Sequence, residues 1–517
     1  MKNKVIYLAI LAAGFASCEP EFENEVTNGS YSAGDADFSS YVAIGNSLTS
    51  GYMDGTVSRI GQTYSFPNIL AQQFAIVGGG AFTQPSYAED VNNLGGISGI
   101  PGFPTRLIID AQAGGPEPIS GASTVTLTPQ ATAFNNMGVP GAKTFHLLAP
   151  GYGNPGGLAT NPPTANPYYV RMATSATATV LGDAMTKNPT FFTNWIGNND
   201  VLGYATNGGS GSTSGMGGAD ITPAPVFENA YNTIINTLTA NGAKGVVATI
   251  PNVTDIPFFT TVPYNPLTAS VIGLGNEANG VALINQLNAQ LVGPVKQVLT
   301  ALGHGDRIEL LSTTEGNPLL IKDETLTNLA PQLTGALTLA GVPALQAGAI
   351  GAIFGQARHA RPTDLVLLTT RGVIGTAPSS PLAVDPLNKY GITYPLEDQH
   401  ILIPSEITEV SNATSTFNNI IKDAAEAKGL GVVDMNAIMN QLVSGLRVQD
   451  GTIYTADYFS TATLSTVMFS LDGIHPNARG YALIANEVIK VINSHYNAKL
   501  PFVSAGNYPG ATVLPQN

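Results

Sequence analysis

Short apolar runs alternate with helical segments along this chain. Runs typical of buried strands occupy residues 41–45, 191–196, 245–250 and 431–434. A further strand is expected to end near residues 133–136. Helices are predicted at residues 67–74, 226–240 and 478–492, the last with apolar side chains at helical spacing. This alternation predicts an α/β fold in which a parallel sheet carries helices on both faces, with its functional loops at the carboxyl ends of the strands.

Two stretches interrupt this pattern. Residues 77–129 are expected to be mostly loop, with hairpin strands at 106–110 and 124–128. Residues 260–404 form a long insertion with predicted helices at 280–302, 328–340 and 344–356. No charged residue occurs from 325 to 357, but prolines break the segment too often for a membrane span. We favour a pair of buried helices here over a cap whose inner face lines an acyl-chain groove.

The first residues have the layout of a secretory signal, a basic start followed by the apolar stretch 5–15. Small residues precede Cys18, the only cysteine of the chain, and this resembles a bacterial lipobox. The resemblance implies cleavage before Cys18 and its lipidation, which would anchor the protein to a membrane of the cell envelope. The acidic tether at 19–37 resembles the surface-export signals of Bacteroidetes lipoproteins, which favours the outer membrane and a surface-exposed position.

Composition narrows the class of partner. The chain has 517 residues, with 21 Lys and Arg against 35 Asp and Glu, so its net charge is −14. This charge argues against binding to nucleic acid and against electrostatic docking on anionic lipid. The length allows one large domain, expected at residues 38–498, with a tail at 499–517. The sequence leaves the oligomeric state open.

Candidate chemistry lies at the two ends of this domain. Ser47 follows the first apolar run in a small turn, and Asp472 and His475 lie three residues apart just before the last predicted helix. A serine nucleophile needs a base to take its proton, and the base needs a partner that fixes its tautomer. Gly141 and Asn199, in loops after the second and third strands, could donate hydrogen bonds to an oxyanion.

These pieces together resemble a known family. Gly45-Asn46-Ser47-Leu48, Gly141, Gly197-x-Asn199-Asp200 and Asp472-x-x-His475 are similar, in order, to the four blocks of the SGNH (GDSL-type) hydrolases. The resemblance implies a flavodoxin-like, three-layer parallel sheet carrying the large, mainly helical insertion. It covers the parts of the chain that bear the sheet and leaves the insertion without a family function.

The resemblance also implies roles for single residues. Ser47 would be the nucleophile, His475 the general base and acid, and Asp472 the residue that orients His475. The oxyanion hole would consist of the N–H groups of Ser47 and Gly141 and the side-chain amide of Asn199. The family has Asp before the serine where this chain has Asn46, so a carboxylate beside the nucleophile is missing.

The implied function is hydrolysis of carboxylic esters with acyl or lipid-like groups. Two alternatives stay open: removal of O-acetyl groups from glycans at the cell surface, and a non-catalytic glycan-binding lipoprotein. The other histidines show no metal-ligand spacing, and no nucleotide-binding loop is present, so no metal or cofactor is expected. Phe258 and Phe259, after the fourth strand, are either substrate-wall or core residues.

Overall fold

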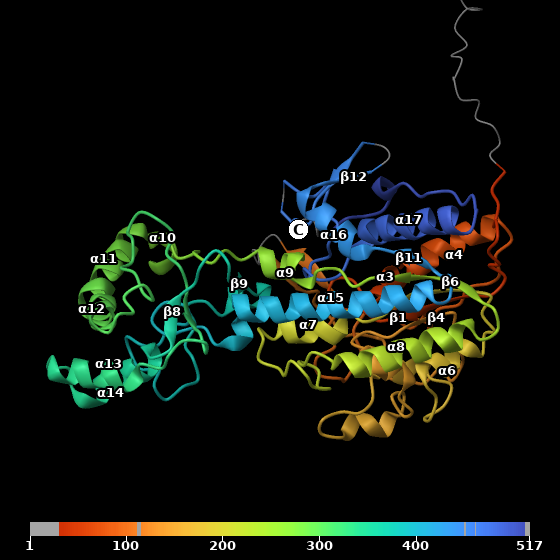
Figure 1. Ribbon diagram of the computed structural model, residues 1–517. Helices are drawn as coiled ribbons and strands as arrows, with labels where there is room; N and C mark the ends of the chain where they lie inside the picture. Colours follow the sequence, from red (N-terminus) through yellow and green to blue (C-terminus); the bar gives the residue numbers. More distant parts are fainter. Residues whose placement is uncertain (1–29, 111–114, 449–450, 461, 512–517) are drawn as a thin grey trace, which may run out of the picture.

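The computed structural model describes residues 30–110, 115–448, 451–460 and 462–511. A five-stranded parallel sheet organises the chain, with the spatial order β11-β6-β5-β1-β4 (Figure 1). The strands are β1 (Tyr41–Gly45), β4 (Asn136–Gly138), β5 (Phe191–Trp195), β6 (Lys244–Ala248) and β11 (Gly431–Val433). Numbered along the chain within this sheet, the order is 2-1-3-4-5, a common doubly wound arrangement.

Helices cover both faces of the sheet, so the fold is the three-layer α/β fold that the sequence predicted (Figure 1). On one face α17 packs against α4, β6 and β11. On the other face α15 packs against α8, β6 and β11, and α6 lies against β1. These helices are α4 (Phe66–Ile76), α6 (Val180–Met185), α8 (Ala224–Thr239), α15 (Pro404–Glu426) and α17 (Ala478–His495).

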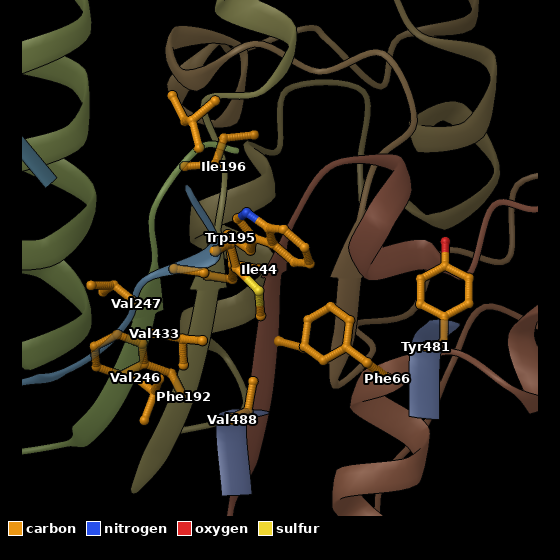
Figure 2. Packing of buried hydrophobic residues seen from close by; sticks show 14 of the residues in the cluster. Ile44, Phe66, Phe192, Trp195, Ile196, Val246, Val247, Val433, Tyr481 and Val488 are labelled. Atoms are coloured by element: carbon orange, nitrogen blue, oxygen red, sulfur yellow. The ribbon is translucent and has the colours of Figure 1, made fainter. Parts of the chain in front are cut away.

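The core lies between these layers, and its side chains explain the short apolar runs. All residues of β1 and β5 are buried, because both strands lie in the middle of the sheet. Figure 2 shows part of this cluster, with Phe66 from α4 and Val488 from α17 beside the strands that carry Ile44 and Trp195. The rings of Phe66 and Trp195 meet edge to face, with centroids 5.8 Å apart.

The last residue of β1 must be small. Gly45 is paired with Trp195 in the parallel register. A Cβ on Gly45 would lie 2.5 Å from the Trp195 carbonyl oxygen and 2.1 Å from Thr49 Oγ1. The glycine therefore lets β1 turn sharply into the next helix while staying close to β5.

The insertion forms a separate lobe beside the sheet, with a hydrophobic core of its own (Figure 1). All three of its predicted helical segments are confirmed. They comprise α11 (Glu277–Leu287), a π-helical turn at Asn288–Val292, α12 (Gly293–Ala301), α13 (Ala330–Leu339) and α14 (Ala344–Phe354). Two pairs of antiparallel strands complete the lobe, β7 (Leu320–Lys322) with β8 (Ala357–His359) and β9 (Leu365–Val366) with β10 (Ile401–Leu402).

The uncharged sequence suggested a fully buried α13–α14 pair, but the two helices are partly exposed. The two helices pack on each other, but Leu339 is 92% exposed and Leu345 is 90% exposed where one helix leads into the next. Leu333 and Leu337 of α13 are buried, so each helix buries only one side. The expectation of a helix pair enclosed between the sheet domain and the rest of the insertion is therefore wrong at this end.

Two expectations for the smaller strands need correction. β4 starts at Asn136, whereas the strand was expected to end near residues 133–136. Its first residue is polar, so no apolar run marks the start of the strand. The expected strand at 106–110 exists as β2 (Leu107–Asp110), which pairs with β3 (Gly115–Pro118), but residues 124–128 form no strand.

The expected tether and tail are also more closely attached than their composition suggested. Ser32 and Lys499 form an antiparallel bridge, and the Asp35 N–H donates to the Tyr496 carbonyl at 2.7 Å. Leu500 is buried, and the Val503 N–H donates to the side chain of Asn486 on α17 at 2.9 Å. Backbone pairing does not depend on side-chain polarity, so an acidic composition does not exclude it. Residues 30–37 and 499–511 therefore belong to the domain.

The remaining elements are short. They are α2 (Ser47–Ser50), α3 (Arg59–Thr63), α5 (Pro167–Met172), α7 (Asn199–Thr206), α9 (Pro257–Thr260), α10 (Ala269–Ile272), α16 (Met435–Ser444), β12 (Leu446–Arg447) and β13 (Ile453–Tyr454).

Within the part of the chain that the structure describes, no helix is both long enough and apolar enough to span a membrane.

Candidate active site

The candidate residues gather at the carboxyl edge of the sheet, where the strand order reverses. Ser47 follows β1, Gly141 follows β4 and Asn199 follows β5. Asp472 and His475 come from the loop that precedes α17. In doubly wound sheets this edge is the usual ligand-binding position, because neighbouring loops diverge there and leave a crevice.

The turn at Ser47 is held by its neighbours. Asn46 is fully buried and caps α2, since its Oδ1 accepts the N–H of Leu48 at 3.0 Å. Gly138 of β4 lies directly against this helix, and a Cβ there would be 2.3 Å from the Ser50 nitrogen. Ser47 is thereby placed as the first residue of a helix, where its N–H has no partner within that helix.

Three side chains that are far apart in the sequence form one hydrogen-bonded chain. His475 Nε2 lies 2.8 Å from Ser47 Oγ, and His475 Nδ1 lies 2.9 Å from Asp472 Oδ2. The loop itself holds the carboxylate, because Asp472 Oδ1 accepts the N–H groups of Ile474 at 2.9 Å and His475 at 2.8 Å. This geometry would let an imidazole take a proton from the serine while the carboxylate keeps the other ring nitrogen protonated.

The surroundings of Asp472 favour its ionised form. Burial raises the pKa of this carboxyl group, but the neighbouring His475 and the hydrogen bonds it accepts lower the pKa by more, so the result lies below the ordinary value. The Gly55 N–H adds a further bond to Asp472 Oδ2 at 3.1 Å. An ionised carboxylate at this position stabilises a protonated imidazole.

A second carboxylate, Asp54, lies behind Asp472 and was not identified from the sequence. Asp54 and Gly55 form a tight turn with φ of 55° and 81°, which the Asp-Gly dipeptide favours. Asp54 Oδ1 accepts the Leu471 N–H at 3.0 Å, and its own N–H donates to Ser470 Oγ at 3.0 Å. The turn thus fixes the loop that carries Asp472. Burial, together with the charge of Asp472, raises the pKa of Asp54 to about 7.

The raised pKa of Asp54 predicts a pH-dependent stability. The folded state keeps a proton on Asp54 up to about pH 7, whereas the unfolded chain loses it near its ordinary pKa of 3.8. This group therefore lowers the free energy of unfolding as the pH rises through that window. Asp54→Asn retains the acceptor and tolerates positive φ but does not titrate, so from pH 5 to pH 8 it should gain roughly 1–3 kcal/mol relative to the wild type. Urea unfolding at both pH values measures this difference, and a pH-independent difference would contradict it.

The candidate oxyanion donors are positioned by the two loops after β4 and β5. Among the hydrogen bonds of the described residues, the N–H groups of Ser47 and Gly141 have no acceptor. The side-chain amide of Asn199 donates to the Ala142 carbonyl at 2.9 Å, which leaves its second hydrogen available. Asn199 is therefore linked to the loop that carries Gly141 and borders the same cavity as Ser47.

Asp200, in the segment after β5, binds Thr144 in the segment after β4 and so links the two loops. Its Oδ2 accepts both the N–H and the hydroxyl of Thr144 at 2.9 Å. Asp200 is buried, and burial raises its pKa to about 6 although the bonds from Thr144 counteract this. The motif that contains Asn199 supplied Asp200 from the sequence, but only the structure shows that Asp200 holds the Gly141 loop.

Asn46 makes a side-chain hydrogen bond on each side of the turn at Ser47. Its Nδ2 donates to Asn198 Oδ1 at 3.1 Å, while its Oδ1 holds the helix that begins at Ser47. A neutral amide thus satisfies one donor and one acceptor at a position where an ionised carboxylate would face another side-chain oxygen.

An apolar cavity of about 110 Å³ opens beside Ser47. The residues that line it include Ser47, Asn199 and His475, together with apolar side chains of α16 and α17. Among the described residues, none from the insertion lines this cavity. Phe258 and Phe259 do not line it either. Both are buried, and the Phe258 N–H donates to the Gly473 carbonyl, so Phe258 supports the loop that carries Asp472 and His475.

Four of the other five histidines make structural hydrogen bonds with the backbone. The ring nitrogens of His146, His359 and His400 each accept a backbone N–H. Across the described residues, no three or more His, Cys, Asp or Glu side chains are grouped so that they could hold a metal ion. Cys18, the predicted lipidation site, lies outside the described residues.

Comparison of the chain with protein-family models, with curated proteins and with solved structures finds no match. The fold and the geometry of the site by themselves define a three-layer α/β protein with a serine–histidine–aspartate constellation at the carboxyl edge of its parallel sheet.

Proposed function

We propose that this protein is a serine-dependent carboxylic ester hydrolase of the SGNH class. The observation that carries the proposal is the continuous path from Ser47 Oγ to His475 Nε2 at 2.8 Å and from His475 Nδ1 to Asp472 Oδ2 at 2.9 Å. The sheet order, which flavodoxin-like folds share, adds support, as does the order of the four sequence blocks.

In the proposed reaction, His475 Nε2 accepts the serine proton as Ser47 Oγ attacks the ester carbonyl carbon. The negative charge that develops on the carbonyl oxygen would be held by the N–H groups of Ser47 and Gly141 and by the Asn199 amide. His475 then gives the proton to the departing alcohol, and the acyl group stays on Ser47. Water then attacks the acyl carbon while His475 Nε2 takes one of its protons. The bond between this carbon and Ser47 Oγ breaks, and His475 returns the proton to Ser47 Oγ as the carboxylic acid is released.

Labelling with a fluorophosphonate tests this proposal directly. These reagents modify a serine that a neighbouring base activates, so the label should be found on Ser47 in peptide mass spectrometry, and p-nitrophenyl esters should be hydrolysed. A folded protein that neither reacts nor hydrolyses any ester would instead favour the non-catalytic glycan-binding alternative.

We further propose that Cys18 carries a lipid anchor that holds the enzyme at the cell envelope, in the outer membrane with its catalytic domain exposed. Support comes from the basic start, the apolar stretch and the small residues before Cys18. A single acyl chain binds membranes only marginally, whereas a diacylglyceryl group with an N-acyl chain on Cys18 would give stable anchoring.

Cys18→Ser should therefore move the protein from the membrane fraction to the soluble fraction and leave hydrolysis of soluble esters unchanged. The reason is that the replacement removes the thiol that carries the lipid and lies far along the chain from Ser47. Cell fractionation and mass spectrometry of the mature N-terminus measure the effect. An unmodified thiol in the wild type would contradict the anchor.

A further inference from the structure

The cavity beside Ser47 has polar groups only at its catalytic end. Twenty-one residues line it, and apart from Trp195 those with polar side chains are Ser47, Asn198, Asn199 and His475. The Trp195 indole N–H is already used, because it donates to the Thr249 carbonyl at 3.2 Å. Among the described residues, no charged side chain lines the cavity.

Two helices, α16 and α17, contribute much of the apolar wall of the cavity. On α16, Met435, Ile438, Met439 and Leu442 follow the i, i+3, i+4, i+7 spacing that places side chains on one face. Leu483 and Ile484 of α17 contribute to the same lining. Such a wall has no partner for hydroxyl groups, and burying a sugar there would leave its hydrogen bonds unmade. The flexible methionines can instead adapt to an alkyl chain.

We propose that this cavity binds the acyl chain of the ester, and that the enzyme is selective for medium-length acyl groups over acetyl groups. The inference rests on the proposed function, because it takes Ser47 as the residue that is acylated. The acyl chain would extend from Ser47 along α16, and the alcohol would lie towards solvent.

The two-step reaction decides between the acyl and the alcohol side. The acyl group remains bonded to Ser47 Oγ through the second step, whereas the alcohol must leave and be replaced by water that reaches His475. A cavity that stays filled by the attached chain keeps its apolar wall dry. An alcohol chain in the same place would have to be replaced by water in an apolar space, which is unfavourable.

The length of the α16 wall sets the expected chain length. From Met435 to Leu442 the helix rises by about 10 Å, at about 1.5 Å per residue. An extended alkyl chain advances about 1.25 Å per carbon, so roughly eight carbons match this wall. Each additional methylene that becomes buried can raise kcat/KM by up to about four-fold, until the cavity is full.

A series of p-nitrophenyl esters from acetate to palmitate tests the wild-type protein. We expect kcat/KM to peak near octanoate and to exceed the value for acetate by at least ten-fold. A preference for acetate, or no dependence on chain length, would overturn the proposal. Alkyl acetates of increasing alcohol length provide the opposite series, and a stronger dependence in that series would also overturn it.

Variants of the wall connect the selectivity to this cavity. Leu442→Trp should lower the octanoate-to-acetate ratio of kcat/KM by at least ten-fold, because the larger indole would occupy space in the cavity that Leu442 lines. Val443→Trp provides the matched control, since Val443 lies next to it on α16 but is exposed and does not line the cavity, and the ratio should not change. If Leu442→Trp does not fold, Leu442→Ala should shift the preferred chain to longer acyl groups. An unchanged ratio in the folded variant would contradict the assignment.

Fluorophosphonate labelling separates this inference from the proposed function. A labelled Ser47 with no chain-length dependence overturns only the acyl cavity. Absence of both labelling and ester hydrolysis overturns the proposed function and the cavity together.

Discussion

Ser47→Ala is expected to reduce kcat for a p-nitrophenyl ester by about 10³-fold or more. The hydroxyl that would attack the ester is lost, and His475 Nε2 loses the partner that lies 2.8 Å away. The triad residues act as a unit, so the intact His475 and Asp472 cannot compensate for the missing nucleophile. Steady-state kinetics at equal concentrations of folded protein would measure the loss, and a fluorophosphonate should label the wild type but not Ser47→Ala.

A second serine-to-alanine change serves as the control. Ser58→Ala also removes a buried hydroxyl, the one that caps α3 by accepting the Gly61 N–H at 3.2 Å. It should cost about 1 kcal/mol of stability without a comparable loss of activity. A folded Ser47→Ala protein with wild-type turnover would eliminate Ser47 as the nucleophile.

The strands that position the site were predictable because each is an apolar run with a clear end. β1 matches its prediction at both ends, and β5 and β6 agree to within two residues. β4 was misplaced because Asn136, which begins it, is polar yet buried, and its amide donates to the Thr49 carbonyl at 3.0 Å. A strand stabilised by such a bond has no apolar pattern in the sequence.

The candidate site likewise contains residues that the sequence could predict and one that it could not. Asp472 and His475 are three residues apart, so their contact could be expected from the local sequence, and the family order suggested where Ser47 would join them. Asp54 could not be found in this manner, since its bond to the Leu471 N–H spans 417 residues. The Asp-Gly dipeptide predicts a turn there but not the loop that the turn supports.

The apolar pattern of the α16 residues that line the cavity is visible in the sequence. Residues 435–444 carry apolar side chains at helical spacing, which predicts the buried face of α16. The uncharged segment of the insertion had suggested two alternatives, a favoured pair of buried helices and a cap lining an acyl-chain groove, and neither pointed to α16. The insertion buries its apolar residues mostly in its own core, because its chain is long enough to form one, and it leaves the cavity to α16 and α17.

Asn199→Ala should lower kcat by roughly 10²–10³-fold with a smaller change in KM. Charge on the carbonyl oxygen develops only towards the transition state, so a donor to this oxygen contributes more to the transition state than to substrate binding. Asn199 already donates one amide hydrogen to the Ala142 carbonyl at 2.9 Å, which fixes the direction of the other hydrogen. Fixed donors stabilise the transition state best because they need no reorganisation.

Asn207→Ala is the matched control for this prediction. Asn207 ends the same helix, α7, and its amide likewise donates to a backbone carbonyl, that of Gly203 at 2.8 Å, but it is exposed and does not line the cavity. Both variants lose one such bond, so a difference in kcat between them reports what Asn199 does at the site, either through its second hydrogen or through its hold on the Gly141 loop. Because Asn199 also holds the Gly141 loop, Asn199→Asp, which could not donate to either oxygen when ionised, should be as inactive as Asn199→Ala. Equal kcat values for the wild type and Asn199→Ala would remove Asn199 from the oxyanion hole and leave the N–H groups of Ser47 and Gly141 as its only candidates.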